Sequence, residues 1–235
     1  MQARVLVCFS VLSLCVAADT SAPVPDAIVD HYCAATKAQE KSVSGASMEV
    51  DIEGFLPKLK KHGKLHALRR ISPLGLIKYE KVLFEGDRTV NKEVIQRYLN
   101  AEAESQKEHR SDIAVTPQNY NFKFKGMNRS NGSDVYVFQV TPKQKRESLF
   151  RGEVWIDTLT YLKVQESGYL VKNPSMLIKK VAFIRKYEIH DGISLPKQVL
   201  SIVDTRLVGK AELTIDFTKF EIEPTRRTSA ETGDQ

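Results

Sequence analysis

The sequence has no apolar run long enough to cross a membrane, few cysteines and a single tryptophan. A membrane-spanning helix needs about 20 consecutive apolar residues, and no stretch of this chain approaches that length. The composition is otherwise ordinary, with 42% hydrophobic and 27% charged residues, 12 glycines and 9 prolines. These values exclude collagen-like, low-complexity and wholly disordered chains. The 235 residues suffice for one domain, or two small ones, with a sizeable core.

The sequence also lacks the short motifs that mark catalytic and metal sites. There is no glycine-rich phosphate loop and no Gly-x-Ser-x-Gly turn. His62 and His66 are four residues apart, but Gly63 and a turn-and-strand pattern keep them off a common helical face. Acidic residues are dispersed along polar strand faces. We therefore expect no catalytic residue, no metal site and no cofactor, and a secreted enzyme is the least favoured alternative.

The first 18 residues predict a secretory signal peptide. Arg4 precedes an apolar run over residues 5–17, and Ala17 and Ala18 form a small-residue cleavage site. The run is too short for a signal anchor. A lipidated cysteine normally follows a small residue, whereas Leu14 precedes Cys15. We therefore expect an exported, periplasmic protein that starts near residue 19 and carries no lipid anchor.

Removal of residues 1–18 leaves Cys33 as the single cysteine. One thiol cannot form an intramolecular disulfide, so the exported domain depends on its hydrophobic core. Cys33 itself lies in a helical pattern, where a small apolar residue is the simpler interpretation than a reactive thiol. The expected organisation is a linker over residues 19–24, a single domain over 25–222 and a polar, disordered tail over 223–235.

Hydrophobic periodicity predicts two helices and about nine strands. The helices cover about residues 25–40 and 91–108, where apolar residues recur at three- and four-residue spacing. The strands alternate with period two, as in Met48, Val50 and Ile52. Tight connections favour an antiparallel meander, and the helices do not alternate with the strands. The predicted fold is mainly β (α+β), a curved antiparallel sheet or unclosed β-barrel with helices packed in or over its concave face.

Two local patterns refine this prediction. Leu213, Ile215 and Phe217 share a strand face, but the next apolar residue is Phe220, so we expect a bulge at residues 218–219 that bends the strand. The alternative is a strand that twists out past the sheet edge. Residues 135–140 are apolar on both faces, so both faces must be covered. A helix would cover one face, and more core or a ligand the other.

Four segments of the C-terminal half resemble a known family. They are Gly152-Glu-Val-Trp-Ile-Asp157, Tyr161-Leu-Lys-Val164, Phe183-Ile-Arg-Lys-Tyr187 and Asp191-Gly-Ile-Ser-Leu-Pro196. These segments are similar to bacterial outer-membrane lipoprotein-sorting proteins of the LolA-like superfamily. The resemblance covers residues 130–222 well, the helix at 25–40 and the following strand also fit, and residues 85–115 fit least. It implies an unclosed antiparallel barrel with helices over its mouth and an apolar cavity for acyl chains.

The resemblance implies a lipid- or lipoprotein-acyl-chain-binding protein that acts as a carrier or chaperone in outer-membrane lipoprotein sorting. An envelope-stress sensor or interaction domain of the same fold is the alternative. We expect a mostly apolar cavity between the concave sheet face and the helix over residues 91–101. Its candidate lining is Val50, Ile52, Phe84, Phe122, Phe124, Phe138, Trp155, Phe183 and Phe217.

Basic residues form clusters at 58–64, 69–70, 143–146, 179–180 and 185–186, and the net charge is +6. Solvated loops and faces account for most such clusters. In an exported protein nucleic acid is not an expected partner, whereas an anionic membrane surface or lipid headgroup is. The expected partners are therefore lipid or lipoprotein acyl chains, with transient contact to an anionic membrane, and we expect a monomer.

Overall fold

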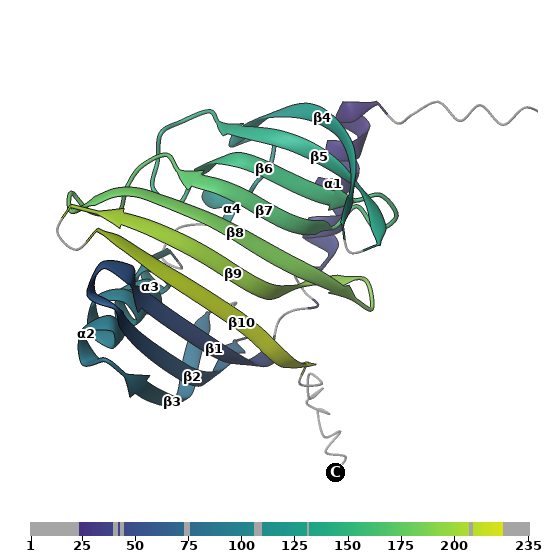
Figure 1. Ribbon diagram of the computed structural model, residues 1–235. Coiled ribbons are helices and arrows are strands. Elements are labelled where there is room, and N and C mark those ends of the chain that lie inside the picture. The colour runs from purple at the N-terminus through teal and green to yellow at the C-terminus, as the bar shows by residue number, and fades with distance from the viewer. Residues whose placement is uncertain are drawn as a thin grey trace, which may run out of the picture.

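The computed structural model describes residues 24–39, 42, 45–72, 76–105, 110–130, 132–206 and 209–222. The expected signal peptide and C-terminal tail lie outside these residues. The strands form one sheet, antiparallel throughout, in the order β3-β2-β1-β10-β9-β8-β7-β6-β5-β4 (Figure 1). Only the β1–β10 contact joins strands that are distant in sequence. The rest is the meander that the tight connections predicted.

The sheet has ten strands, against about nine expected from the sequence. They are β1 (Ala46–Leu56), β2 (Lys61–Ile71), β3 (Ile77–Gly86), β4 (Tyr120–Ser130), β5 (Ser133–Pro142), β6 (Phe150–Asp157), β7 (Lys163–Leu170), β8 (Ile178–His190), β9 (Ile193–Thr205) and β10 (Lys210–Ile222). The helical segments are α1 (Pro25–Gln39), the 3-10 turn η1 (Pro57–Leu59), α2 (Arg88–Val90), the π-turn η2 (Asn91–Ile95), α3 (Gln96–Ser105) and α4 (Arg110–Ile113). No helix among the described residues is long and apolar enough to span a membrane.

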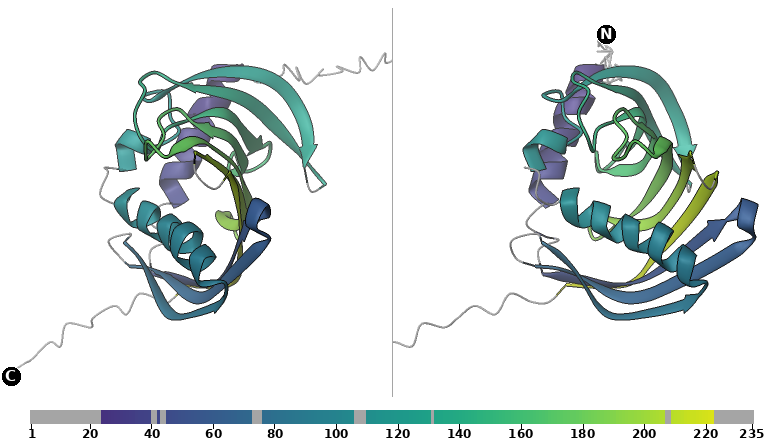
Figure 2. Two further views of the ribbon diagram at one scale, coloured as in Figure 1. Left: turned by 60° about the vertical axis from the view of Figure 1, so that its left-hand side comes forward. Right: turned by 90° about the vertical axis from the view of Figure 1, so that its left-hand side faces the viewer.

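The sheet curls around the helices without closing. Strands β3 and β4 are its two edges, and they do not pair with each other. Figure 2 shows the curl, with α1 inside one half and α3 across the mouth of the other. The structure therefore confirms the predicted curved, unclosed antiparallel barrel with helices over its concave face.

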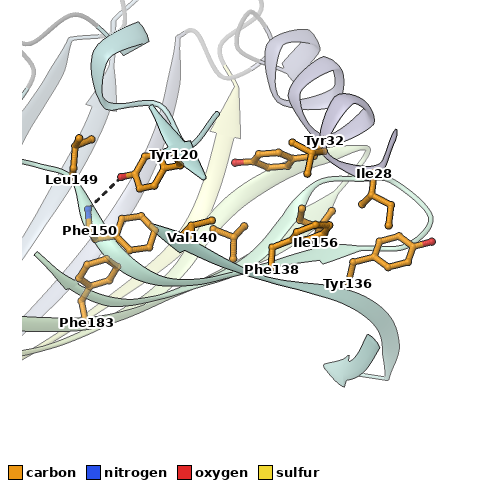
Figure 3. Close-up of a cluster of buried hydrophobic side chains, with 12 residues drawn as sticks. Ile28, Tyr32, Tyr120, Tyr136, Phe138, Val140, Leu149, Phe150, Ile156 and Phe183 are labelled. Carbon is orange, nitrogen blue, oxygen red and sulfur yellow. Dashed lines mark hydrogen bonds between the residues drawn. The ribbon is translucent and has the colours of Figure 1, made fainter. Parts of the chain in front are cut away.

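Helix α1 packs on the half of the sheet built from β4 to β8. Its buried side chains Ile28, Val29 and Tyr32 alternate with exposed ones at helical spacing. They contact a cluster rich in aromatic residues, which we call the first core (Figure 3). Its members are Ile28, Val29, Tyr32, Tyr120, Tyr136, Phe138, Val140, Leu149, Phe150, Val154, Ile156 and Phe183. Cys33 is partly buried against this core, as expected for a small apolar residue.

A continuous helical stretch from α2 through α3 covers the other half of the sheet. Asp87 caps its first turn, because the carboxylate accepts the Thr89 and Val90 N–H groups at 2.8 and 3.1 Å. Gly54 on β1 allows close approach, since a Cβ there would lie 2.8 Å from Cγ1 of Val90. The cluster beneath the helix is the second core, made of Val50, Ile52, Leu65, Ala67, Ile95, Leu213 and Ile215.

One local prediction about the backbone, the bend in the last strand, is confirmed. Ser47 lies opposite Glu221 and Glu49 opposite Thr218, so β10 carries one extra residue there, and Lys219 has φ 49°. This is the bulge predicted from the break in alternation. Asp191 and Gly192 form the β8–β9 turn, with φ of 50° and 75°. Two positive φ values suit a two-residue hairpin turn, which favours the Asp-Gly sequence.

Candidate binding site on the concave face

One row of side chains, which we call the central row, crosses the concave face of all ten strands. The strand register places in it, from β4 to β3, Phe124, Phe138, Val154, Glu166, Arg185, Val199, Ile215, Ile52, Leu65 and Phe84. Every member is apolar except the two at the centre. The acid and the base therefore separate the two cores, and this boundary is the chemically distinctive part of the molecule.

Glu166 is a buried carboxylate held by three partners. Its side chain is 2% exposed, and it accepts hydrogen bonds at 2.8 Å from Lys163 Nζ and Tyr187 Oη. Arg185 Nη1 lies 3.6 Å from Oε2, the oxygen that also accepts from Tyr187. Burial alone would raise the pKa of Glu166, but the charges of Lys163 and Arg185 outweigh it and lower the pKa to about 2. Glu166 is therefore ionised, and it in turn raises the pKa of Lys163 against the effect of burial.

Arg185 differs from Glu166 in that solvent reaches it. Its side chain is 44% exposed although it lies on the concave face beside Glu166. The guanidinium lies over the Phe183 ring, with the carbon 4.4 Å from the ring centroid. Solvent therefore reaches the boundary between the two cores at Arg185, and we call this solvent-accessible boundary the opening.

The helical side of this opening carries a second charged group. Arg69 on β2 pairs with Glu102 on α3 at 3.1 Å, and the Tyr79 hydroxyl on β3 donates to the same carboxylate. These contacts attach α3 to the sheet. Tyr98, also on α3, is close enough to interact electrostatically with both Glu102 and Arg185, and its burial raises the pKa of its hydroxyl. Tyr98 thus brings the Arg69–Glu102 pair electrostatically close to Arg185.

The candidate lining residues fall into four groups. Val50 and Ile52 are fully buried in the second core, and Phe217 packs against it. Phe138 and Phe183 lie in the first core (Figure 3), with Phe122 packed against it. Phe84 and Phe124 lie on the edge strands and are 44% and 36% exposed. Trp155 lies on the convex face, since its neighbours on β6 point into the first core.

The position of Trp155 removes it from the concave lining. Val154 and Ile156 are fully buried beneath α1, and alternation along β6 turns Trp155 to the opposite face. There it lies across from Val137 on β5, and its indole N–H donates to Glu153 at 3.1 Å. Trp155 therefore covers the second apolar face of β5, which the sequence expected to be covered by more core or a ligand.

A shallow pocket of about 400 Å³ lies elsewhere, at the C-terminal end of α1. It is lined by Ala35, Ala38, Gln39, Ser42, Thr160, Leu162, Asp191, Gly192 and Ile193. Its wall mixes small, polar and apolar groups, and it includes none of the residues of the central row. We therefore assign the candidate site to the opening at Arg185.

Sequence reasoning missed the charged centre, the cluster formed by Glu166, Lys163 and Arg185. Glu166 has no local signal, because it lies in a short strand of mixed polarity. Arg185 does have one: Phe183, Arg185 and Tyr187 alternate along β8 and so share a face. A charge between two aromatic residues of one strand face indicates a buried ion pair or a ligand contact.

Comparisons with known proteins find structural likeness alone. No family model and no curated protein matches the chain. A DUF1329 family protein from Desulfovibrio piger is 13% identical, with 85% of this chain and 93% of that chain covered and a TM-score of 0.42. An outer membrane lipoprotein-sorting protein domain from Vibrio parahaemolyticus is 12% identical, with 83% and 92% covered and a TM-score of 0.40.

A LolA superfamily protein from Nitrosomonas europaea is 9% identical, with 85% of this chain and 93% of that chain covered and a TM-score of 0.36. The last two proteins carry names from the family that the C-terminal motifs resemble. Identity and TM-score are low throughout, so the site is interpreted from the residues of this chain.

Proposed function

We propose that the protein binds the acyl chains of lipids or lipoproteins and acts as a periplasmic carrier in outer-membrane lipoprotein sorting. One observation carries the proposal. The central row is apolar on either side of its charged pair, and solvent reaches the opening at Arg185. An acyl chain that enters there lies against one or both cores. Burial of ten methylenes would contribute about 8 kcal/mol, at about 0.8 kcal/mol for each.

Helix α3 is the element that would move to admit a chain. None of the residues Gln96–Ser105 is fully buried, and Tyr98 and Leu99 pack only partly against the second core. In Figure 2 the helix crosses the mouth of the curled sheet. Displacing it therefore exposes less apolar surface than displacing α1, which buries three side chains. The carrier proposal includes export by the signal peptide over residues 1–18, without a lipid anchor.

An envelope-stress sensor or interaction domain of the same fold is the second candidate. It is favoured by the edge strand β3, where Val82, Leu83 and Phe84 are 38%, 62% and 44% exposed. An apolar edge strand can accept a strand from another protein. A secreted enzyme is less favoured, because the buried charges Glu166 and Arg69 are already paired with Lys163 and Glu102.

An anionic membrane surface is the second proposed partner. The connections at 57–60, 143–149 and 171–177 join antiparallel neighbours and meet, together with Arg206 and Gly209, at one end of the sheet, on the left in Figure 1. They hold seven basic residues and one acidic residue. The connections at the other end, 72–76, 131–132, 158–162 and 191–192, hold one charged residue, Asp191.

Apolar side chains accompany this basic end. Met176 is 92% exposed, Leu59 45% and Leu177 44%. Arg206 links two of the connections, since its Nε donates to the Met176 carbonyl at 2.9 Å. Basic residues beside exposed apolar ones suit a surface of anionic headgroups over acyl chains.

A fluorescent fatty-acid probe tests the acyl-chain function. We expect the wild-type protein to bind the probe and an unlabelled fatty acid to displace it. Val199 adjoins Arg185 in the concave row, so Val199→Trp should fill the opening and weaken binding roughly tenfold. Leu200→Trp places the same side chain on the opposite face and should bind as the wild type does. A wild-type protein that binds no probe, or equal binding by the two variants, would refute the proposal.

A further inference from the structure

We propose that Arg185 is a headgroup subsite that selects acyl ligands with one anionic group, a carboxylate or a phosphate. The inference rests on the proposed function and names the class of ligand that the opening takes. A ligand with its anionic end on Arg185 has apolar surface beside it at Val199, the next residue in the row, which is only partly buried against the second core.

The charged centre has a surplus of positive charge. Glu166 faces two cations, Lys163 and Arg185. It is satisfied at 2.8 Å by Lys163 and by Tyr187, whereas Arg185 lies 3.6 Å away, beyond normal hydrogen-bond length. A second anion would balance the remaining charge without displacing either short bond.

Arg185 is positioned to receive that anion. Its guanidinium rests on Phe183 at 4.4 Å, and one edge is turned to Glu166. Tyr187 and Tyr98 also lie close enough to interact with it electrostatically, and its side chain is 44% exposed. Five N–H donors in a rigid plane suit two-point binding of carboxylate or phosphate. The aromatic support fixes that plane before the ligand arrives.

The test compares oleate with its methyl ester, which has the same chain without the charge. Both are measured by displacement of a neutral fluorescent acyl probe. We expect Arg185→Gln to weaken oleate binding roughly tenfold to a hundredfold, the effect of losing a charge-assisted hydrogen bond, and to leave the ester unchanged. Unchanged ester binding also shows that the variant is folded. Lys186→Gln, which removes the same charge from the next residue on the opposite face, should change neither ligand.

Three results would overturn the subsite. Oleate binding that survives Arg185→Gln, or equal losses for oleate and ester, makes Arg185 a structural partner of Glu166 only. A wild-type protein that binds the ester as tightly as oleate also refutes it, although the acyl-chain function then stands. Binding of neither ligand removes both proposals. Oleoyl lysophosphatidic acid, tested in parallel, shows whether carboxylate or phosphate is preferred.

Discussion

Glu166 lies on the concave face between two apolar cores. It keeps its charge because two cations and a hydroxyl surround it. An ion in such a place is costly to desolvate, and its partners offset the cost only while all are present. Removal of one partner therefore destabilises the folded protein by more than the intact pair stabilises it. The charged centre both stabilises the fold and gives the opening its chemistry.

Substitution of Glu166 tests this balance. Glu166→Gln leaves Lys163 and Arg185 without their counter-ion, and we expect a loss of about 3–5 kcal/mol in the free energy of unfolding at pH 7. Urea unfolding measures it. Glu188→Gln is the control, since Glu188 pairs with Lys197 in an exposed position, and it should cost no more than about 1 kcal/mol. Equal losses from the two variants would contradict the account.

The pH dependence of stability follows from the same carboxylate. Its pKa is lowered from 4.5 to about 2 in the folded protein, so its stabilising effect is complete above about pH 4.5. As the pH falls from 4.5 towards 2, the unfolded chain binds a proton before the folded one, and about 3 kcal/mol is lost. Glu166→Gln should lack this part of the acid destabilisation. An unchanged acid profile in the variant would show that Glu166 does not hold its charge.

Single residues were the least predictable part of the molecule. The alternation of Met48, Val50 and Ile52 correctly predicted a buried face, and the broken alternation near Phe220 predicted the bulge at Lys219. Neither pattern shows which face of a strand lies inside the curl. Trp155 was therefore assigned to the concave lining, although α1 covers the opposite face of β6.

At the scale of elements, the order and type of the segments follow from local sequence. The helix expected over 91–108 begins instead at Arg88. The Asp87 carboxylate caps its first turn, and Gly54 and Gly63 let this turn approach the sheet closely. Residues 85–115, which fit the family resemblance least, contain this helix and its attachment to the sheet through Glu102. The contact between Glu102 and Arg69 joins positions 33 residues apart, and no local pattern reveals such a pair.

At the scale of elements, we predict that the hairpin connections at the basic end of the sheet bind anionic membranes. Vesicles of phosphatidylcholine with 30% phosphatidylglycerol should bind the protein at low salt, less so as salt screens the charges. Removal of three exposed lysines by Lys58→Gln, Lys60→Gln and Lys145→Gln should weaken binding about 100-fold, at about 1 kcal/mol for each charge.

The control removes the same net charge from other surfaces. Lys123→Gln, Lys125→Gln and Lys186→Gln alter exposed lysines on β4 and β8, and vesicle binding should stay close to that of the wild type. Equal losses from the two triple variants would mean that the protein responds to overall charge, with no docking end. Strong binding to pure phosphatidylcholine would also contradict a site for anionic lipid.

At the scale of the whole molecule, the curl of the sheet creates the site. The second core combines β1 and β2 with β9 and β10, and these sequence-distant strands lie together only because β1 pairs with β10. The sequence predicted the curvature from long strands with few helices. It did not predict that the interior divides into two packed cores around a charged centre, because that division depends on the register of all ten strands. The proposed site, an exposed Arg185 between two apolar cores, depends on that division.

Native mass spectrometry of the protein purified from the cell envelope tests the central claim most directly, because it weighs the protein together with what it carries. We expect the wild-type chain to carry an acyl-bearing molecule, released as a lipid on activation, and Val199→Trp to appear as the bare chain. Leu200→Trp, which places the same tryptophan side chain on the convex face, should keep the lipid. A bare wild-type chain, or the same lipid load on both tryptophan variants, would contradict the proposal that the concave face holds an acyl chain.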